Sequence, residues 1–133
     1  MKKAKKSPLK IYVFGNSILK EDSLAIKTAK KLEKIFPEVN FIYQDPNEEI
    51  KEKNLFILDV AQGIKKVSLI NDLNKLEFSN RVSLHDFDLT FSLKLMKKIG
   101  LVKKINIIAI PINYDEKKAY EEVKNYLHLT FKK

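Results

Sequence analysis

Three side chains of this sequence have the chemistry to recognise a metal ion together: Asp22, Asp59 and His85. Two carboxylates and one neutral imidazole form a ligand set that suits zinc or nickel. Three protein ligands also leave coordination positions open for groups from another molecule. We therefore expect a carboxylate–carboxylate–imidazole site for metal recognition.

Each of the three residues also has a structural explanation. Asp22 in a first helical turn would complement the helix macrodipole, and Asp59 would cap a turn after its strand. His85 would belong to a hydrogen-bonded helix start, where Ser83 and Asp86 resemble a capping box. For Asp59 this explanation is weaker, because a carboxylate at the end of an apolar central strand is costly unless it is paired or solvated. The joint case for a site is stronger than the single cases, because the three side chains together form a ligand set that suits zinc or nickel.

Alternating strands and helices must position these residues. Apolar and helical periodicities predict strands at 9–14, 39–43, 54–59 and 105–110, a short antiparallel strand at 66–70, and helices at 22–36, 86–98 and 115–129. The alternation predicts an α/β fold, a three-layer α/β/α sandwich around a mostly parallel, five-stranded mixed sheet. Asp59 is predicted to be the last residue of its strand. Ligands of such sheets bind beyond the carboxyl ends of the parallel strands, where the three residues can converge.

Length and composition limit the remaining possibilities. The 133 residues fit one α/β domain spanning 1–133, with residues 1–8 as a flexible basic N-terminus. The absence of cysteine excludes disulfides, Cys-type zinc sites and thiol catalysis. No apolar run approaches the roughly 20 residues of a membrane span, and no signal peptide is visible. We expect a cytoplasmic monomer with no membrane partner.

The formal charge of +9 could indicate a nucleic-acid binder. Of the 26 basic residues, however, only Arg81 is an arginine, the preferred bidentate reader of phosphate. Scattered lysines are more typical of solvated helix faces. We therefore expect no nucleic-acid partner. A basic α/β nucleic-acid binder remains as a third, less favoured function.

Other chemistries have weaker signals. The segment VFGNSILKED has one glycine where a dinucleotide fingerprint needs three, and the chain has no GK[ST] motif. Ser17 and Ser23 fall near the predicted site, but no G-x-S-x-G elbow exists. His128 is expected to be a surface or packing residue.

Three stretches resemble the motifs of the hydrogenase maturation endopeptidases, which trim a C-terminal peptide from the large-subunit precursor of nickel–iron hydrogenases. They are VFGNSILKED, with Phe14 in place of the usual first glycine, LFILDVA, and SLHDFDLTFSLKLMKKIG leading to INIIAIPIN. Their order and spacing match the family over about residues 9–113. The resemblance implies that Asp22, Asp59 and His85 contact the metal and that Gly15 and Asn16 bind substrate.

The resemblance also implies a mechanism. The nickel belongs to the substrate, so no resident cofactor is expected, although zinc or cadmium could occupy the same ligands. The protease would inspect the inserted nickel and then cleave the precursor, with hydrolysis of the aspartic or metal-assisted type. The attacking group would be water, oriented by Asp22 or Asp59 or polarised by the metal, so the catalytic residues stay unassigned. The alternative is a diverged, non-catalytic homologue that acts as a precursor- or metal-binding module.

Overall fold

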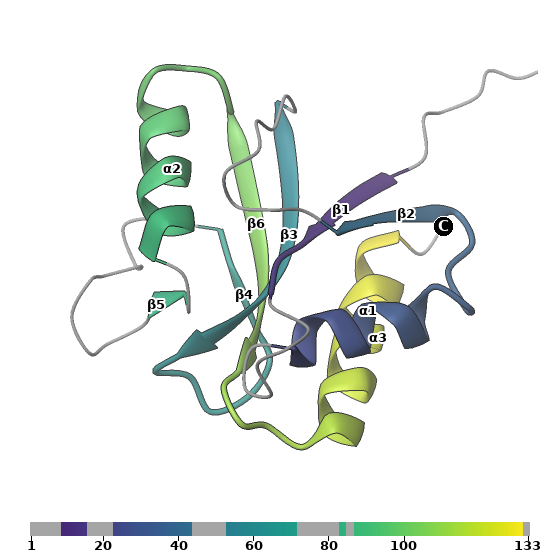
Figure 1. The fold of residues 1–133 in the computed structure, drawn as a ribbon. Helices are drawn as coiled ribbons and strands as arrows, with labels where there is room; N and C mark the ends of the chain where they lie inside the picture. The colour runs from purple at the N-terminus through teal and green to yellow at the C-terminus, as the bar shows by residue number, and fades with distance from the viewer. Residues whose placement is uncertain (1–8, 16–22, 44–52, 72–82, 85–86, 132–133) are drawn as a thin grey trace, which may run out of the picture.

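The computed structural model describes residues 9–15, 23–43, 53–71, 83–84 and 87–131. These segments form a mixed β-sheet with helices on both faces (Figure 1). The strands are β1 Leu9–Val13, β2 Val39–Tyr43, β3 Asn54–Gln62, β4 Ser68–Ile70, β5 Ser83–Leu84 and β6 Lys104–Pro111. The helices are α1 Leu24–Leu32, α2 Phe87–Lys98 and α3 Glu116–Phe131.

The strand order along the sheet is β2-β1-β3-β6-β4, and β5 adds to β3 outside this path. β1, β2, β3 and β6 run parallel, whereas β4 runs antiparallel to β6 and β5 antiparallel to β3. The central strands β3 and β6 are apolar through most of their length, as expected of parallel strands that are covered on both faces. The predicted α/β fold with a mostly parallel sheet of five strands in its main path is confirmed.

Helices cover the two faces unequally. α1 and α3 pack on one face, where their buried side chains join Leu58, Val60 and other sheet residues in one apolar cluster (Figure 1). α2 lies on the other face, where Leu93 joins a second cluster with Ile57 and Ala61. Because successive side chains of a strand point to opposite faces, alternate residues of β3 belong to the two clusters.

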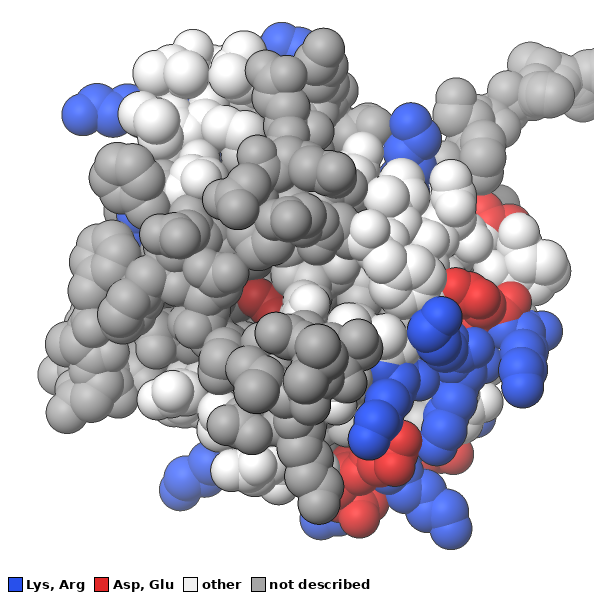
Figure 2. Space-filling view, in the orientation of Figure 1, with Lys and Arg blue, Asp and Glu red and all other residues white. Residues whose placement is uncertain are grey.

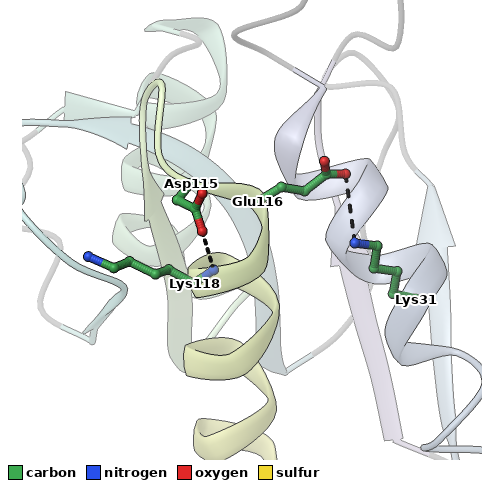
Figure 3. Close-up of polar contacts among 4 residues, drawn as sticks. All are labelled: Lys31, Asp115, Glu116 and Lys118. Carbon is green, nitrogen blue, oxygen red and sulfur yellow. Dashed lines mark hydrogen bonds and ion pairs between the residues drawn. The ribbon is translucent and has the colours of Figure 1, made fainter.

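The first turn of α3 shows how a helix is started and attached in this protein. Asp115 precedes the helix, and its Oδ2 accepts a hydrogen bond of 2.9 Å from the backbone N–H of Lys118 (Figure 3). This is the N-cap arrangement that satisfies a free helical N–H. The next residue, Glu116, lies 3.9 Å from Lys31 of α1, and both side chains are about half exposed. Such a surface pair adds at most about 1 kcal/mol to the packing of the two helices.

α2 ends in a Schellman motif built around Gly100. The N–H of Gly100 donates to Lys97 O (3.2 Å), and the N–H of Leu101 donates to Met96 O (2.9 Å). Gly100 has a φ of 87°, the left-handed conformation that this motif requires and that glycine adopts most readily. The chain can therefore leave the helix sharply and return to the sheet as β6.

Several element boundaries differ from the sequence prediction. α1 ends at Leu32 rather than Phe36, because Lys34 and Ile35 donate to carbonyls three residues back and form turns. β3 continues to Gln62 rather than ending at Asp59. β4 is antiparallel as predicted, with β6 as its partner, but it begins at Ser68 rather than at residue 66. β5, at Ser83–Leu84, was not predicted as a strand.

Candidate functional site

Asp59 lies inside the sheet, near the carboxyl end of its central strand. It pairs in register with Ala109 of β6 on one side, and its predecessor Leu58 pairs with Val13 of β1 on the other. By strand alternation its side chain lies on the same face as Ile57 and Ala61, the face that α2 covers. The prediction that Asp59 ends its strand is wrong, because three more residues pair with neighbouring strands.

The Asp59 carboxyl group is enclosed by the protein, with only 2% of the residue exposed. Its Oδ1 accepts a hydrogen bond of 2.7 Å from the backbone N–H of Val60. Aspartate is seldom this buried in proteins, because removal of a carboxylate from water is costly unless polar groups or a metal compensate for it. The alternative that Asp59 merely caps an exposed turn is also wrong, since the residue is in mid-strand and buried.

The end of β1 comes next to Asp59 in the sheet. The N–H of Phe14 donates to Leu58 O at 3.0 Å, which extends the β1–β3 pairing to the residue before Asp59. Gly15 follows at the exposed surface with a φ of 151°, a conformation that residues with a side chain rarely adopt. A glycine at this turn lets the chain leave the sheet directly beside the carboxyl half of β3.

β5 brings a third segment to the same place. Leu84 pairs with Ala61, two residues beyond Asp59, and Ser83 pairs with Gln62. His85 follows Leu84 directly in the sequence, and α2 begins two residues later at Phe87. The strand that precedes His85 is therefore attached to the strand that carries Asp59.

The structure describes two of the five predicted site residues. Asp59 lies in the carboxyl-terminal half of β3, three residues before its end, and Gly15 lies two residues after the end of β1, so both are on the expected side of the sheet. Asp22, His85 and Asn16 lie outside the described residues, so the complete ligand set is not brought together in the part of the chain that the structure describes. Within that part, no group of three potential metal ligands is found.

Two further polar residues flank the described part of this edge: Ser23, which the sequence already places near the predicted site, and Gln62, which it does not single out. Ser23, which follows Asp22 and precedes α1, is 2% exposed. Gln62 is the exposed last residue of β3 and pairs with Ser83. The continuation of the apolar run past Asp59, in the sequence DVAQ, was the signal that could have identified Gln62 as the strand end.

His128 is confirmed as a surface and packing residue. It is exposed on α3, and its ring centroid lies 5.0 Å from that of Phe36. Among the described helices, none has the length and apolar character needed to cross a membrane.

No family model matches the chain, and none of the curated proteins matches it. Its fold is similar to the crystal structure of an uncharacterized protein from Wolinella succinogenes, with a TM-score of 0.54 and 13% sequence identity. The superposition covers 92% of this chain and 99% of that chain. At this identity the likeness shows the α/β fold alone.

Proposed function

We propose that this protein is a metal-checking endopeptidase that removes the C-terminal peptide of a nickel–iron hydrogenase large-subunit precursor after nickel insertion. The observation that carries the proposal is the carboxyl group of Asp59, buried near the carboxyl end of the central parallel strand. This is the edge at which α/β sheets bind ligands. A carboxylate there can bind a metal or orient a water molecule.

Two neighbouring features support the proposal. The strand that leads to His85 pairs with β3 two residues beyond Asp59. The glycine of the FGN sequence adopts a φ of 151°, which accounts for a glycine at this point of the motif. Asp22 and His85 would complete the metal contacts, and Gly15 and Asn16 would contact the substrate peptide.

In this proposal the nickel arrives on the precursor, and the protein's own residues inspect it. Asp22, Asp59 and His85 would bind the metal only when it has been inserted, which would position the scissile bond at the site. A water molecule held by Asp22 or Asp59, or polarised by the metal, would attack that bond. A metal-free precursor would lack this contact and would stay intact.

The direct test is to incubate the protein with a nickel-loaded large-subunit precursor and to measure the precursor mass. We expect the loss of a C-terminal peptide with the nickel-loaded precursor and no loss with the metal-free one. Asp59→Asn should reduce the cleavage rate by roughly 10²–10⁴-fold, the usual contribution of a positioned acid or base. The circular dichroism spectrum and Tm should show that the variant stays folded.

Asp115→Asn is a matched control. It makes the same chemical change on α3, where asparagine is an equally good N-cap, and it should leave cleavage unchanged. No mass change with a cognate, nickel-loaded precursor would contradict the proposal.

The second candidate is a non-catalytic module that binds the precursor or its metal. The hydrogen bond from Val60 N–H to Asp59 Oδ1 favours it, because this bond gives the carboxylate a structural role. Precursor binding without cleavage, weakened by His85→Ala, would identify this function instead of the enzyme.

A further inference from the structure

The exposed end of α2 carries large aliphatic side chains that the core does not use. Leu95 is 47% exposed, Ile99 60% and Leu101 52%. We refer to these three residues as the α2 patch. They contrast with Leu93, which is fully buried against the sheet, and with Met96, which packs partly against the same cluster.

Helix geometry explains why the patch faces outward. At 100° per residue, Leu95 and Ile99 form one row about one turn long, on the side of α2 opposite Leu93. The Schellman motif at Gly100 then places Leu101 outside and returns Val102, which is 1% exposed, to the core. Because the fold already fixes the helix through Leu93 and Val102, it has no need for the three exposed side chains.

Lysines lie around this patch. Lys97 and Lys98 are exposed in the last turn of α2, and Lys103 and Lys104 are exposed after Val102. Lys97 Nζ donates to Lys103 O at 3.3 Å, so the helix end and the start of β6 are in contact. The N–H groups of Lys103 and Lys104 donate to Lys53 O, which adds the exposed Lys53 to the group. These five residues are the lysine rim.

The charge of this surface is of one sign in the described residues. The described segments 92–104 and 53–54 contain no Asp or Glu. Glu52, which precedes Lys53 in the sequence, lies outside the described residues. In the view of Figure 2, uncharged side chains cover the upper end of α2 with lysines beside them, whereas acidic and basic residues are mixed over α1 and α3.

We propose that the α2 patch and its lysine rim bind the surface of an anionic lipid bilayer. Aliphatic side chains that project from a basic surface can enter the boundary between headgroups and acyl chains, while lysines contact the anionic headgroups. From the sequence no membrane partner is expected, because no apolar run approaches the length of a membrane span. Binding at the bilayer surface requires no such segment.

The composition of the surface favours lipid over the other partners. Protein interfaces are enriched in aromatic residues, Met and Arg and depleted in Lys, and the patch with its rim has lysines but no aromatic residue or arginine. Nucleic-acid sites combine phosphate contacts with aromatic stacking and with bidentate arginines, and this surface has neither an aromatic residue nor an arginine. Two copies of the chain would bring two lysine rims together, and their like charges would repel each other.

The α2 patch does not overlap the candidate site. Lys104 of the lysine rim is the first residue of β6, and Lys53 directly precedes Asn54, the first residue of β3. Asp59 lies near the opposite, carboxyl end of β3. The two surfaces are therefore at opposite ends of the parallel strands. A bilayer at the α2 patch would face away from the edge that carries Asp59, and the inference does not rest on protease activity.

Vesicle flotation with the full chain tests the inference. The protein should bind vesicles of phosphatidylcholine mixed with phosphatidylglycerol, bind phosphatidylcholine vesicles weakly, and dissociate as salt is raised. Replacement of Lys98, Lys103 and Lys104 by Gln should weaken binding on the order of a hundredfold, since each lysine near an anionic surface raises the affinity about fivefold. The double variant Ile99→Gln, Leu101→Gln should weaken binding about tenfold or more.

Matched controls come from the other face of the sheet. Lys27, Lys34 and Lys117 are exposed on or beside α1 and α3, and their replacement by Gln should change vesicle binding by no more than about twofold. The double variant Ile35→Gln, Leu129→Gln removes two exposed aliphatic side chains, 43% and 77% exposed, and should also bind like the unchanged protein.

Three results would overturn the inference. The first is equal binding to both vesicle types or none to either, and the second is unchanged binding by the folded α2 variants. The third is absence of vesicle binding together with a different complex that the α2 variants abolish, either a dimer in sedimentation or a DNA complex in gel retardation. That result would assign the surface to a second copy of the chain or to nucleic acid.

Discussion

Tyr43 is an ionisable residue whose environment the fold alters strongly. It is the last residue of β2, and its hydroxyl group donates a hydrogen bond to the Glu33 carboxylate. The ammonium group of Lys30 lies 4.8 Å from the centre of its ring. Desolvation raises the pKa of the Tyr43 hydroxyl above its ordinary value of 10.0. The hydrogen bond to Glu33 and the negative charge of the Glu33 carboxylate raise this pKa further.

This shift predicts a loss of stability at alkaline pH. The native state holds the Tyr43 proton after the unfolded chain has released it, so the stabilisation is complete below about pH 10 and falls as the pH rises above it. Tyr43→Phe removes this dependence. Between about pH 9 and about pH 11, the free energy of unfolding should therefore decrease less in the variant than in the unchanged protein.

Urea denaturation at a series of pH values provides the measurement. The two proteins differ in this one ionisable group, so the difference between the two curves isolates Tyr43. Parallel curves would contradict the prediction. Tyr120→Phe is a suitable control, because its ring also lies near lysines but the described structure gives no hydrogen bond from its hydroxyl group to a carboxylate.

At the scale of single elements, the end of α2 depends on one backbone conformation. Gly100 has a φ of 87°, and a methyl group added there would meet no atom within 4 Å. Gly100→Ala should therefore destabilise the protein by about 1 kcal/mol through backbone strain alone. Gly100→Asn should cost less, since asparagine tolerates this conformation better.

The free energy of unfolding in urea would measure both variants. A Gly100→Ala variant that is as stable as the unchanged protein would show that the helix can end without the left-handed residue. The Asn variant separates strain from any effect of added volume, because its side chain is larger than that of alanine.

Local sequence predicts most elements of this fold, because the strands are apolar runs and the helices have an apolar face. β2 was predicted with its observed bounds, and α2 and β6 to within one residue at each end. The errors arise where long-range pairing decides the structure. Nothing in the dipeptide Ser83–Leu84 favours a strand, and β5 exists because Ala61 and Gln62 offer it partners.

The candidate site shows the same limit. Sequence placed Asp59 correctly on the central strand, because an apolar run that meets a carboxylate is a strong local signal. The strand was predicted to end at Asp59, because a charged side chain usually marks the start of a solvated loop. Only the neighbouring strands β1, β5 and β6, which come from distant parts of the chain, make it possible to bury Asp59 in mid-strand.

At the scale of the whole molecule, the pairing of β3 with β6 is the most extensive in the sheet. It joins eight residue pairs, from Asn54 with Lys104 to Ala61 with Pro111. β4 contributes three pairs at the edge, and β5 contributes two. The central pair is also covered by apolar clusters on both faces.

Amide hydrogen exchange should reflect this difference. The amides of β3 and β6 should exchange slowest, at rates set by global unfolding, whereas those of β4 and β5 should exchange through local opening that exposes little apolar surface. Exchange measured by NMR under native conditions checks the order. Protection of β5 equal to that of β3 would contradict it and would indicate that the two strands open as one unit.

The two-residue length of β5 has a consequence for ligand affinity. If the proposed metal contact needs His85 beside Asp59, only molecules in which β5 is paired with β3 are competent to bind. The apparent dissociation constant is then the intrinsic constant divided by the competent fraction. Substitutions at Ser83 or Gln62 that strengthen the pairing would tighten nickel recognition without altering a single ligand.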